Sequence, residues 1–259
     1  MTILEKILVS KKKELEERKK ISPFDQLMDR VEKIEPNFLS MDKKDIQIIS
    51  EIKRASPSKG DIAIDMNIKE KALQYEKGGA SAVSVLTDYP FFKGSLEDME
   101  EVVSLIKIPV LRKDFIIDEY QIYESLVYGA DSILLIARIL DRDTLNSLFE
   151  KAVSFGLVPL VEIFSDEDFE TIKDIKNSFI GINNRNLSTF DTDLTHCIKM
   201  AEKIDKTNFP VALSGVSKVL DVEFLYKRGM KAFLIGEFLS KSERSDFVLR
   251  SMLERCNNV

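Results

Sequence analysis

Short apolar runs rich in β-branched residues recur along the chain, and their spacing predicts the fold. Eight such runs occupy residues 46–52, 82–87, 108–112, 132–137, 158–163, 179–183, 211–214 and 232–236. Successive runs begin about 27 residues apart on average, which is room for one strand, one helix and two loops. The segments between the runs include stretches with helical periodicity, such as 68–75 and 144–153. Nearly continuous hydrophobicity within a run is typical of parallel strands that are covered on both faces.

Glycines mark the ends of several predicted helices, at Gly78-Gly79, Gly129 and Gly229, just before the next apolar run. Glycine adopts the left-handed conformation that turns the chain at a helix C-terminus. Eight strand–helix units therefore predict an α/β fold, a (β/α)8 TIM barrel in one domain of residues 1–259. The rival is an open doubly wound sheet, which is weakened because no glycine-rich dinucleotide fingerprint follows any of the predicted strands.

The segment 1–45 precedes the first predicted strand, and we predict that it is helical. One helical face gathers the apolar residues Ile3, Leu4, Ile7, Leu8 and Leu15, with Lys and Glu elsewhere. We expect this N-terminal helical extension to cap the barrel rather than to form a separate domain. The run Lys11-Lys12-Lys13 is interpreted as a solvated, charged face of the helix.

Composition and charge argue against several functional classes. The 259 residues carry 38 Lys plus Arg against 44 Asp plus Glu, a net charge of −6, whereas a nucleic-acid binder is normally basic. Two unclustered cysteines, Cys197 and Cys256, and a single histidine exclude a disulfide framework and a Cys-ligated zinc site, although one disulfide stays open. No run of about 18 apolar residues occurs, and the charged N-terminal segment does not resemble a signal peptide. We expect a cytoplasmic protein with no membrane span and no nucleic-acid partner.

Polar residues gather where the predicted strands end, which is where a barrel of this type carries its active site. Glu51 and Lys53 are two apart on an extended chain and therefore point to the same side. Lys113, Glu162 and Asn183 lie at the ends of three other predicted strands. Chemically active side chains from four strand ends in one funnel favour an active site over an ordinary polar surface.

The last two predicted strands end in Ser214-Gly215 and Gly236-Glu237. Glycine lets a ligand approach the backbone, and the N–H groups of such turns can bind an anion. Many barrels hold phosphate at this place. The alternative is that these are ordinary turn residues. A Glu237 side chain pointing inward would repel phosphate, so we expect only its backbone N–H to contribute.

Five motifs resemble the indole-3-glycerol phosphate synthase family, in the same order and at the same spacing. They are ISEIKRASPSKG (49–60), FFKGS (91–95), LRKDFI (111–116), LLIA (134–137) and IGINNRNL (180–187). The resemblance covers nearly the whole chain, including the N-terminal extension. Members of this family close the indole ring of 1-(2-carboxyphenylamino)-1-deoxyribulose 5-phosphate in tryptophan biosynthesis, losing CO2 and water. The resemblance implies a lyase that uses no metal and no organic cofactor.

The resemblance also implies roles for individual residues. Lys113 would protonate the ketone oxygen, Glu162 would take the later proton, and Lys53 would assist departure of the hydroxyl, with the division between the two lysines left open. Glu51 would orient and charge-balance both lysines. The implied substrate contacts are polar ones from Asn183 and Arg185, ring contacts from Phe92, Phe115, Leu134 and Leu187, and phosphate contacts from Ser56, Ser214, Gly215, Gly236 and Glu237. Plain core packing is an equally open interpretation for Leu134.

One residue departs from the family pattern, in which a glutamate precedes the Ser-Gly of the seventh strand. Here that position is Leu213, which puts in doubt how the polar end of the intermediate is held. We predict that Leu213→Glu raises the specificity constant. Two alternatives stay open: another phosphosugar barrel enzyme, such as an isomerase, and a non-catalytic or repurposed phosphosugar-binding relative. Contact with other tryptophan-pathway enzymes has no support in the residues.

Overall fold

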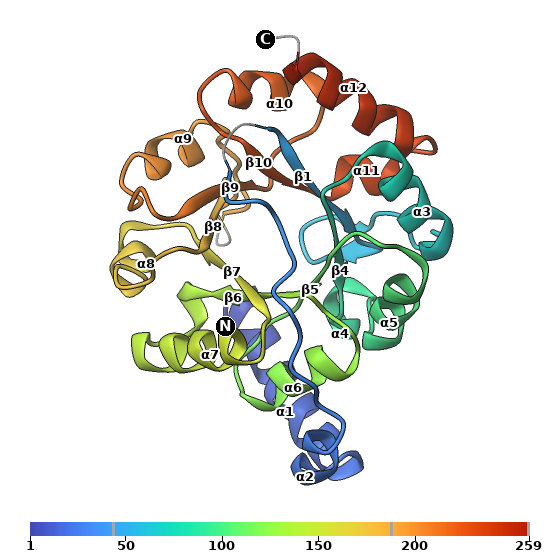
Figure 1. Ribbon diagram of the computed structural model, residues 1–259, viewed down its shortest axis with the longest axis vertical. Coiled ribbons are helices and arrows are strands. Elements are labelled where there is room, and N and C mark those ends of the chain that lie inside the picture. Colours follow the sequence, from blue (N-terminus) through green and yellow to red (C-terminus); the bar gives the residue numbers. More distant parts are fainter. Residues whose placement is uncertain (43–44, 187–188, 258–259) are drawn as a thin grey trace.

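Eight parallel strands close into a barrel in the order β1-β10-β9-β8-β7-β6-β5-β4 (Figure 1). The structure is a computed structural model that describes residues 1–42, 45–186 and 189–257. The barrel strands are β1 (Gln47–Ile52), β4 (Ala82–Leu86), β5 (Val110–Lys113), β6 (Ser132–Ile136), β7 (Val158–Ile163), β8 (Phe179–Asn183), β9 (Phe209–Leu213) and β10 (Ala232–Ile235). Because β1 pairs with both β4 and β10, the predicted barrel is confirmed and the open sheet is excluded.

Helices surround the barrel and cover its outer face (Figure 1). After β1 they are α3 (Ile68–Gly78), α4 (Tyr89–Phe92), α5 (Leu96–Leu105), α6 (Tyr120–Val127), the 3-10 turn η1 (Ala137–Ile139), α7 (Arg142–Ser154), α8 (Asp166–Thr171), α9 (His196–Ala201), α10 (Val219–Tyr226), α11 (Glu237–Lys241) and α12 (Ser245–Asn257). A small antiparallel pair, β2 (Ala55–Ser56) and β3 (Gly60–Asp61), lies in the loop after β1 and was not predicted.

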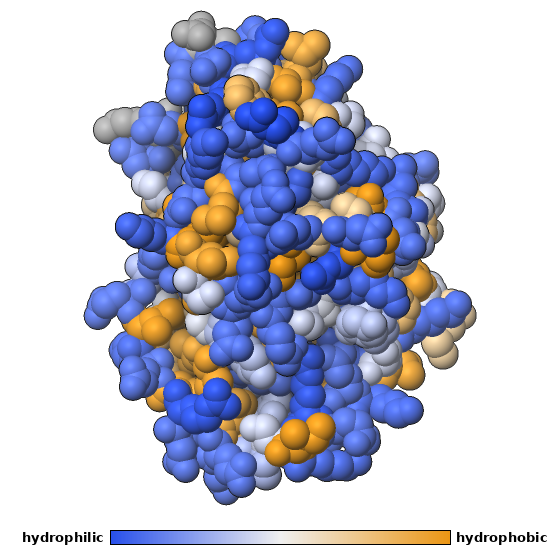
Figure 2. Space-filling model, turned by 90° about the vertical axis from the view of Figure 1, so that its right-hand side faces the viewer, coloured by the Kyte–Doolittle hydropathy of each residue, from blue (hydrophilic) through white to orange (hydrophobic). Residues whose placement is uncertain are grey.

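Local sequence explains where these elements begin and end. Ser95 and Asp98 form a reciprocal capping box at the start of α5, and the Asn67 side chain accepts two backbone N–H groups at the start of α3. At the end of α3, Gly79 takes φ +90°, a left-handed conformation that turns the chain toward β4. The surface seen in Figure 2 is mainly hydrophilic, with apolar residues in small groups. Within the described ranges, no helix is long and apolar enough to cross a membrane.

Two apolar layers follow from the alternation of side chains along each strand. One layer lies between the strands and the helices and includes Ile48 and Ile52 of β1. The other fills the barrel and includes Ile49 of the same strand. Ile52 packs outward, so the alternation directs its neighbours Glu51 and Lys53 to the inside of the barrel, as expected.

The N-terminal extension contacts both ends of the barrel. It forms α1 (Ile3–Ile21) and α2 (Phe24–Met28), but the prediction of helix as far as residue 45 is wrong for residues 29–42. Pro36 lies in this non-helical part, and proline disfavours helix at and before its own position. The segment runs across the barrel toward β1 (Figure 1), where Leu39 joins the interior apolar layer and the Phe38 ring meets Phe179 edge-on at 5.5 Å. Because Phe179 begins β8, this segment closes the N-terminal end of the barrel.

The prediction that Lys11 lies on a solvated face is wrong. Its side chain is 0% exposed, and its Nζ atom lies 2.8 Å from Asp114 and 3.0 Å from Asp88. Lys12 and Lys13 are exposed, as expected. Lys11 is four residues from both Ile7 and Leu15, so it belongs to the face of α1 that packs against the barrel.

Candidate active site

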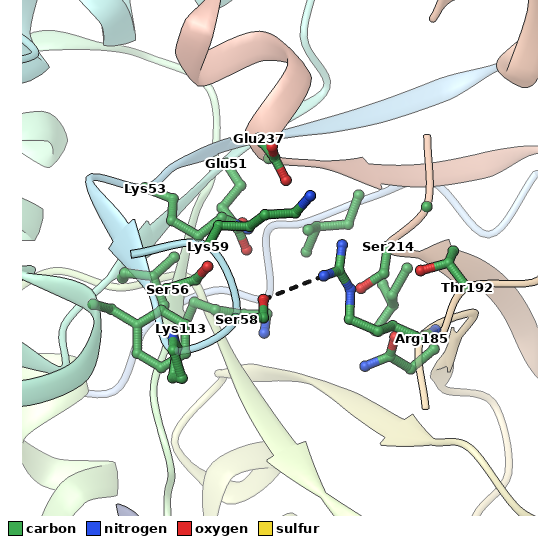
Figure 3. Close-up of a pocket in the computed structure, with 18 of the residues that line it drawn as sticks. Glu51, Lys53, Ser56, Ser58, Lys59, Lys113, Arg185, Thr192, Ser214 and Glu237 are labelled. Atoms are coloured by element: carbon green, nitrogen blue, oxygen red, sulfur yellow. Dashed lines mark hydrogen bonds and ion pairs between the residues drawn. The ribbon is translucent and has the colours of Figure 1, made fainter. Parts of the chain in front are cut away.

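A cavity of about 460 Å3 opens at the C-terminal ends of the barrel strands (Figure 3). Its volume falls in the range of small-molecule sites, and its position is the one where TIM barrels carry their chemistry. Side chains from strand ends, from the loop after β1 and from α1 line it. The α1 contribution is apolar and comprises Ile3, Leu4 and Ile7.

The predicted acid–base residues converge in this cavity as two carboxylate–lysine pairs. Lys53 Nζ lies 2.5 Å from Glu51 Oε1, and Lys113 Nζ lies 3.8 Å from Glu162 Oε2. Asn183 Nδ2 donates a hydrogen bond of 2.9 Å to the other Glu162 oxygen. Asn183 thereby fixes the orientation of Glu162, while the long distance to Lys113 leaves that ammonium group free to donate to a ligand.

Glu51 is ionised in this setting. Burial alone would raise the pKa of its carboxyl, but Lys53, Lys113 and Arg185 outweigh burial and hold that pKa below its ordinary value. The Glu51 side chain is 4% exposed, so its charge is little screened by solvent. An ionised Glu51 compensates the positive charge of the two lysines on the cavity floor.

Gly236 is required for the close approach of the Glu51–Lys53 pair. A Cβ atom on Gly236 would lie 2.1 Å from Glu51 Oε1 and 2.8 Å from Lys53 Nζ. Any side chain at this position would displace the ion pair. This contact is a second reason for glycine here, besides the ligand access expected from the sequence. The neighbouring Glu237 carboxylate pairs with Lys241 at 2.8 Å.

The opposite wall of the cavity carries residues suited to an anion. Ser214 and Gly215 follow β9 with φ of +63° and +90°, and a Cβ atom on Gly215 would lie 2.6 Å from Thr192 Cγ2. Arg185 Nη1 donates to Ser58 Oγ at 3.3 Å across the cavity (Figure 3). Figure 3 shows that Ser56, Lys59 and Ser214 also lie around this space.

The apolar end of the cavity holds the rings of Phe92 and Phe115, with centroids 6.0 Å apart. Leu134 is not among the residues that line the cavity, because it packs deeper, in the apolar layer that fills the barrel. Ile136, two residues nearer the end of β6, lines the cavity instead. Leu187, the other predicted ring contact, lies outside the described residues.

Leu213 makes part of the cavity wall apolar where the family pattern has a carboxylate. Its side chain is 2% exposed and packs over Gly181, whose missing Cβ would lie 2.6 Å from Leu213 Cδ1. Leu213 is opposite Asn183 in the β8–β9 register, so it flanks the Asn183–Glu162 pair.

Several lining residues were given no role on sequence grounds. Ser58 and Lys59 belong to the 49–60 motif, so their signal was present but not used. Thr192 reaches the site through an isolated bridge to Arg185, and the apolar residues of α1 reach it because α1 docks on the barrel. These last contacts have no local sequence signal, since they depend on how distant segments pack.

The described residues contain no group of three or more His, Cys, Asp or Glu side chains that could hold a metal ion. Cys197 and Cys256 are both free and buried, which answers the question of a disulfide between them. The polar side chains that line the cavity are lysines, an arginine, carboxylates, an amide and hydroxyl groups.

Together, the barrel and this cavity define a TIM-barrel enzyme that places acid–base groups between an apolar end and an end lined by Arg185, Ser58 and Ser214. The family model for indole-3-glycerol phosphate synthase matches residues 4–252. The chain belongs to the indole-3-glycerol phosphate synthase family.

Curated relatives agree with this assignment. The indole-3-glycerol phosphate synthase of Campylobacter jejuni subsp. doylei is 43% identical over 97% of this chain and 100% of its own length. The enzyme of the same name from Aliarcobacter butzleri is 44% identical over 91% of this chain and 92% of its own. Neither gives support to the alternative of a repurposed phosphosugar-binding relative.

Solved structures resemble the fold at low sequence identity. Tryptophan synthase subunit alpha from Legionella pneumophila gives a TM-score of 0.62 at 13% identity, covering 83% of this chain and 94% of that one. The 3-hexulose-6-phosphate synthase from Salmonella typhimurium gives 0.65 at 12% identity, covering 82% and 99%. These likenesses bear on the fold alone.

Proposed function

We propose that the cavity closes the indole ring of 1-(2-carboxyphenylamino)-1-deoxyribulose 5-phosphate, with loss of CO2 and water. The observation that carries the proposal is the convergence of two lysine–carboxylate pairs, with Asn183 holding Glu162. Through its family the chain is a carbon–carbon lyase of tryptophan biosynthesis. Side chains of the cavity supply the proton transfers that each step of this reaction needs.

Ring closure joins the aromatic carbon that bears the carboxylate to the ketone carbon of the sugar. As this bond forms, Lys113 donates a proton to the ketone oxygen, which becomes a hydroxyl group. The bond to the carboxylate then breaks, CO2 leaves, and the electron pair of that bond restores the aromatic ring. The distance of 3.8 Å between Lys113 and Glu162 leaves room for the ketone oxygen at the ammonium group.

Dehydration completes the indole. Lys53 donates a proton to the new hydroxyl group, which leaves as water, and Glu162 accepts the proton from the carbon beside the ring nitrogen. Asn183 supports this step because its hydrogen bond of 2.9 Å orients the Glu162 carboxylate. The ionised Glu51 balances the positive charge of Lys53 throughout.

The two ends of the cavity match the two ends of the substrate. Phe92 and Phe115 offer apolar surface for the aromatic ring. Arg185 contacts polar groups of the substrate, and the phosphate lies against the loop after β1 and the turns after β9 and β10. The residues that we assign to the phosphate are Ser56, Ser214, Gly215, Gly236 and the backbone N–H of Glu237, with Lys59 beside them.

Fluorescence of indole-3-glycerol phosphate, formed by purified protein from the synthetic substrate, tests the proposal directly. We expect product from the native protein and CO2 in equal amount. Substrate binding measured by calorimetry without any product would overturn the proposal and favour a phosphosugar-binding protein.

We also propose a cytoplasmic location. The free thiols of Cys197 and Cys256 fit a reducing compartment. Cell fractionation followed by immunoblotting tests this location, and recovery of the protein outside the cytoplasmic fraction would contradict it.

A further inference from the structure

The end of β1 is held in place by hydroxyl groups from two other elements. Ser240 of α11 donates through its Oγ to the carbonyl oxygen of Glu51 at 3.0 Å and accepts from the backbone N–H of Lys53 at 3.3 Å. Tyr75 of α3 donates through its hydroxyl to the same Glu51 carbonyl at 3.1 Å. All three contacts lie at the backbone of the two residues whose side chains form the buried ion pair.

These bonds stand in for a missing strand partner. The pairing of β1 with β10 ends at Ser50 and Ile235, whereas the pairing with β4 continues to Ile52. Beyond Ile235 the chain turns into α11, so the β10 side of Glu51 has no strand beside it. Ser240 satisfies the backbone groups on both sides of Ile52, and it is 4% exposed.

The same short helix borders the anion-binding end of the cavity. Gly236, directly before α11, lies against the Glu51–Lys53 pair, and Glu237 lines the cavity. At the other end of α11, Lys71 of α3 donates to the Ser242 carbonyl at 2.6 Å and to Ser245 Oγ at 3.0 Å. The helix is therefore anchored at its C-terminal end by Lys71 and reaches the cavity at its N-terminal end.

From this arrangement we propose that Ser240 is a positioning residue through which phosphate binding sets the placement of Glu51 and Lys53. The proposal rests on the proposed function, because it takes the substrate phosphate to lie beside Gly236. Contact with the phosphate fixes α11. The two hydrogen bonds of Ser240 then hold the backbone on both sides of Ile52 in a fixed position relative to α11. Binding energy from a part of the substrate that does not react is then used to align the acid–base pair.

Two substrates separate this coupling from a merely structural role. They are the phosphorylated substrate and its dephosphorylated form, 1-(2-carboxyphenylamino)-1-deoxyribulose. We expect Ser240→Ala to lower kcat on the phosphorylated substrate by about 10- to 100-fold, because small misplacements of reacting groups cost this much. On the dephosphorylated substrate, which does not engage α11, we expect kcat to stay within about threefold of the native value. Loss by the same factor on both substrates would overturn the proposal.

Inorganic phosphate gives a second readout with the same proteins. We expect it to raise the rate of the native protein on the dephosphorylated substrate and to have no such effect on Ser240→Ala. Phosphate stimulation that is absent from the native protein, or equal in the two proteins, would also overturn the proposal. Failure of the native protein to convert the phosphorylated substrate would instead overturn the proposed function.

Two matched variants complete the experiment. Tyr75→Phe removes a bond to the same Glu51 carbonyl and a contact with the Ser240 hydroxyl. It leaves both bonds from Ser240 to β1 in place, so we expect its effect on kcat to be equal for the two substrates. Ser242→Ala lies two residues after Ser240 and keeps the backbone carbonyl that Lys71 uses, so we expect native kinetics. A selective loss on the phosphorylated substrate in either control would contradict the specific role of Ser240.

Discussion

Two groups of charged residues meet on strand β5 and differ in how completely their charges are paired. Arg112 and Lys113 are adjacent in β5 and point to opposite sides of the barrel wall. Arg112 is 0% exposed, and its Nη2 atom lies 2.9 Å from Asp114 and 3.1 Å from Glu124. The Lys113 side chain is 19% exposed and lies 3.8 Å from its partner Glu162.

The group around Arg112 joins the N-terminal extension to the barrel. We call it the docking cluster, and it comprises Lys11, Asp88, Arg112, Asp114 and Glu124. Lys11 comes from α1, whereas Asp88 follows β4 and Asp114 follows β5. Asp88 accepts the backbone N–H of Phe91, and Asp114 accepts that of Phe115. These bonds fix the loops that carry the cavity residues Phe92 and Phe115. Each cation of the cluster contacts two carboxylates of the barrel at 2.8 to 3.1 Å.

The completeness of pairing separates the charges that stabilise the fold from those available for chemistry. Burying ions is costly unless opposite charges lie close to them, and each cation of the docking cluster has two carboxylates within 3.1 Å. The two lysines of the cavity pairs are each 19% exposed, and Lys113 keeps donor capacity for a substrate oxygen. Of the two neighbouring cations on β5, Arg112 therefore stabilises the fold and Lys113 is available to the substrate.

The largest effect that we predict is on the chemical step. Lys113→Ala should lower kcat by about 10³- to 10⁴-fold, because the proton donor to the ketone oxygen is lost. Its free energy of unfolding should stay within about 1 kcal/mol of the native value, since the side chain is loosely paired. Product fluorescence and chemical denaturation measure the two quantities. Retention of more than a tenth of the native kcat would remove Lys113 from the mechanism.

The docking cluster should show the opposite pattern. Lys11→Met should lower the free energy of unfolding by about 3–5 kcal/mol, because two buried carboxylates lose a partner. Folded protein should keep kcat within about threefold while KM rises, since α1 lines the apolar end of the cavity but not the acid–base groups. Urea unfolding and steady-state kinetics test both parts. A variant as stable as the native protein would show that Lys11 does not dock α1.

The base of the Lys113–Glu162 pair should matter less than the acid. Glu162→Gln should lower kcat by about 10²-fold, at the low end for an acid–base group, because the amide cannot accept the proton but keeps a contact with Asn183. Steady-state kinetics measures the loss, and a kcat within about threefold of the native value would assign the base to another residue. Asn183→Ala serves as a control for orientation.

Acid should weaken the docking cluster through Asp114. Burial raises the pKa of this carboxyl, but Lys11 and Arg112 outweigh burial and hold it well below its ordinary value. A lowered pKa stabilises the fold above the unfolded-state value of about 3.9, and this contribution is lost as the pH falls through the folded-state pKa. The stability gap between the native protein and Asp114→Asn should therefore shrink as the pH falls below about 4, by about 1.4 kcal/mol per pH unit at most. Thermal unfolding at several pH values measures the gap, and a constant gap would contradict the prediction.

The smallest effect concerns the apolar wall of the cavity. Leu213→Glu restores a carboxylate beside Asn183 and should raise kcat/KM a few-fold, about 1 kcal/mol, by holding the polar end of the intermediate. Leu213→Gln, which matches the glutamate variant in shape, separates charge from shape. An unchanged or lower kcat/KM for the glutamate variant would show that this chain has adapted to leucine.

Local sequence determined the barrel and most of the candidate site. The eight strands follow from β-branched runs whose formation depends on neighbouring residues, and the period of two along β1 directed Glu51 and Lys53 to the same side. The family motifs then marked Lys113, Glu162 and Asn183. The cavity gathers all five residues.

The environments of Lys11, Ile136 and Ser240 depend on contacts between segments that are distant in the sequence. Helical periodicity alone led to the prediction that Lys11 is solvated, like Lys12 and Lys13. Its side chain is instead buried against Asp88 and Asp114, two carboxylates more than 70 residues away in the sequence. In the same way, Ile136 lines the cavity and Leu134 does not, because Leu134 lies deeper in the barrel. Ser240 can bond to the backbone of β1 because β10 ends before it covers Glu51. The physical reason is that secondary structure depends on short-range sequence, whereas burial and the partners of a charge depend on segments that meet only when the chain has folded.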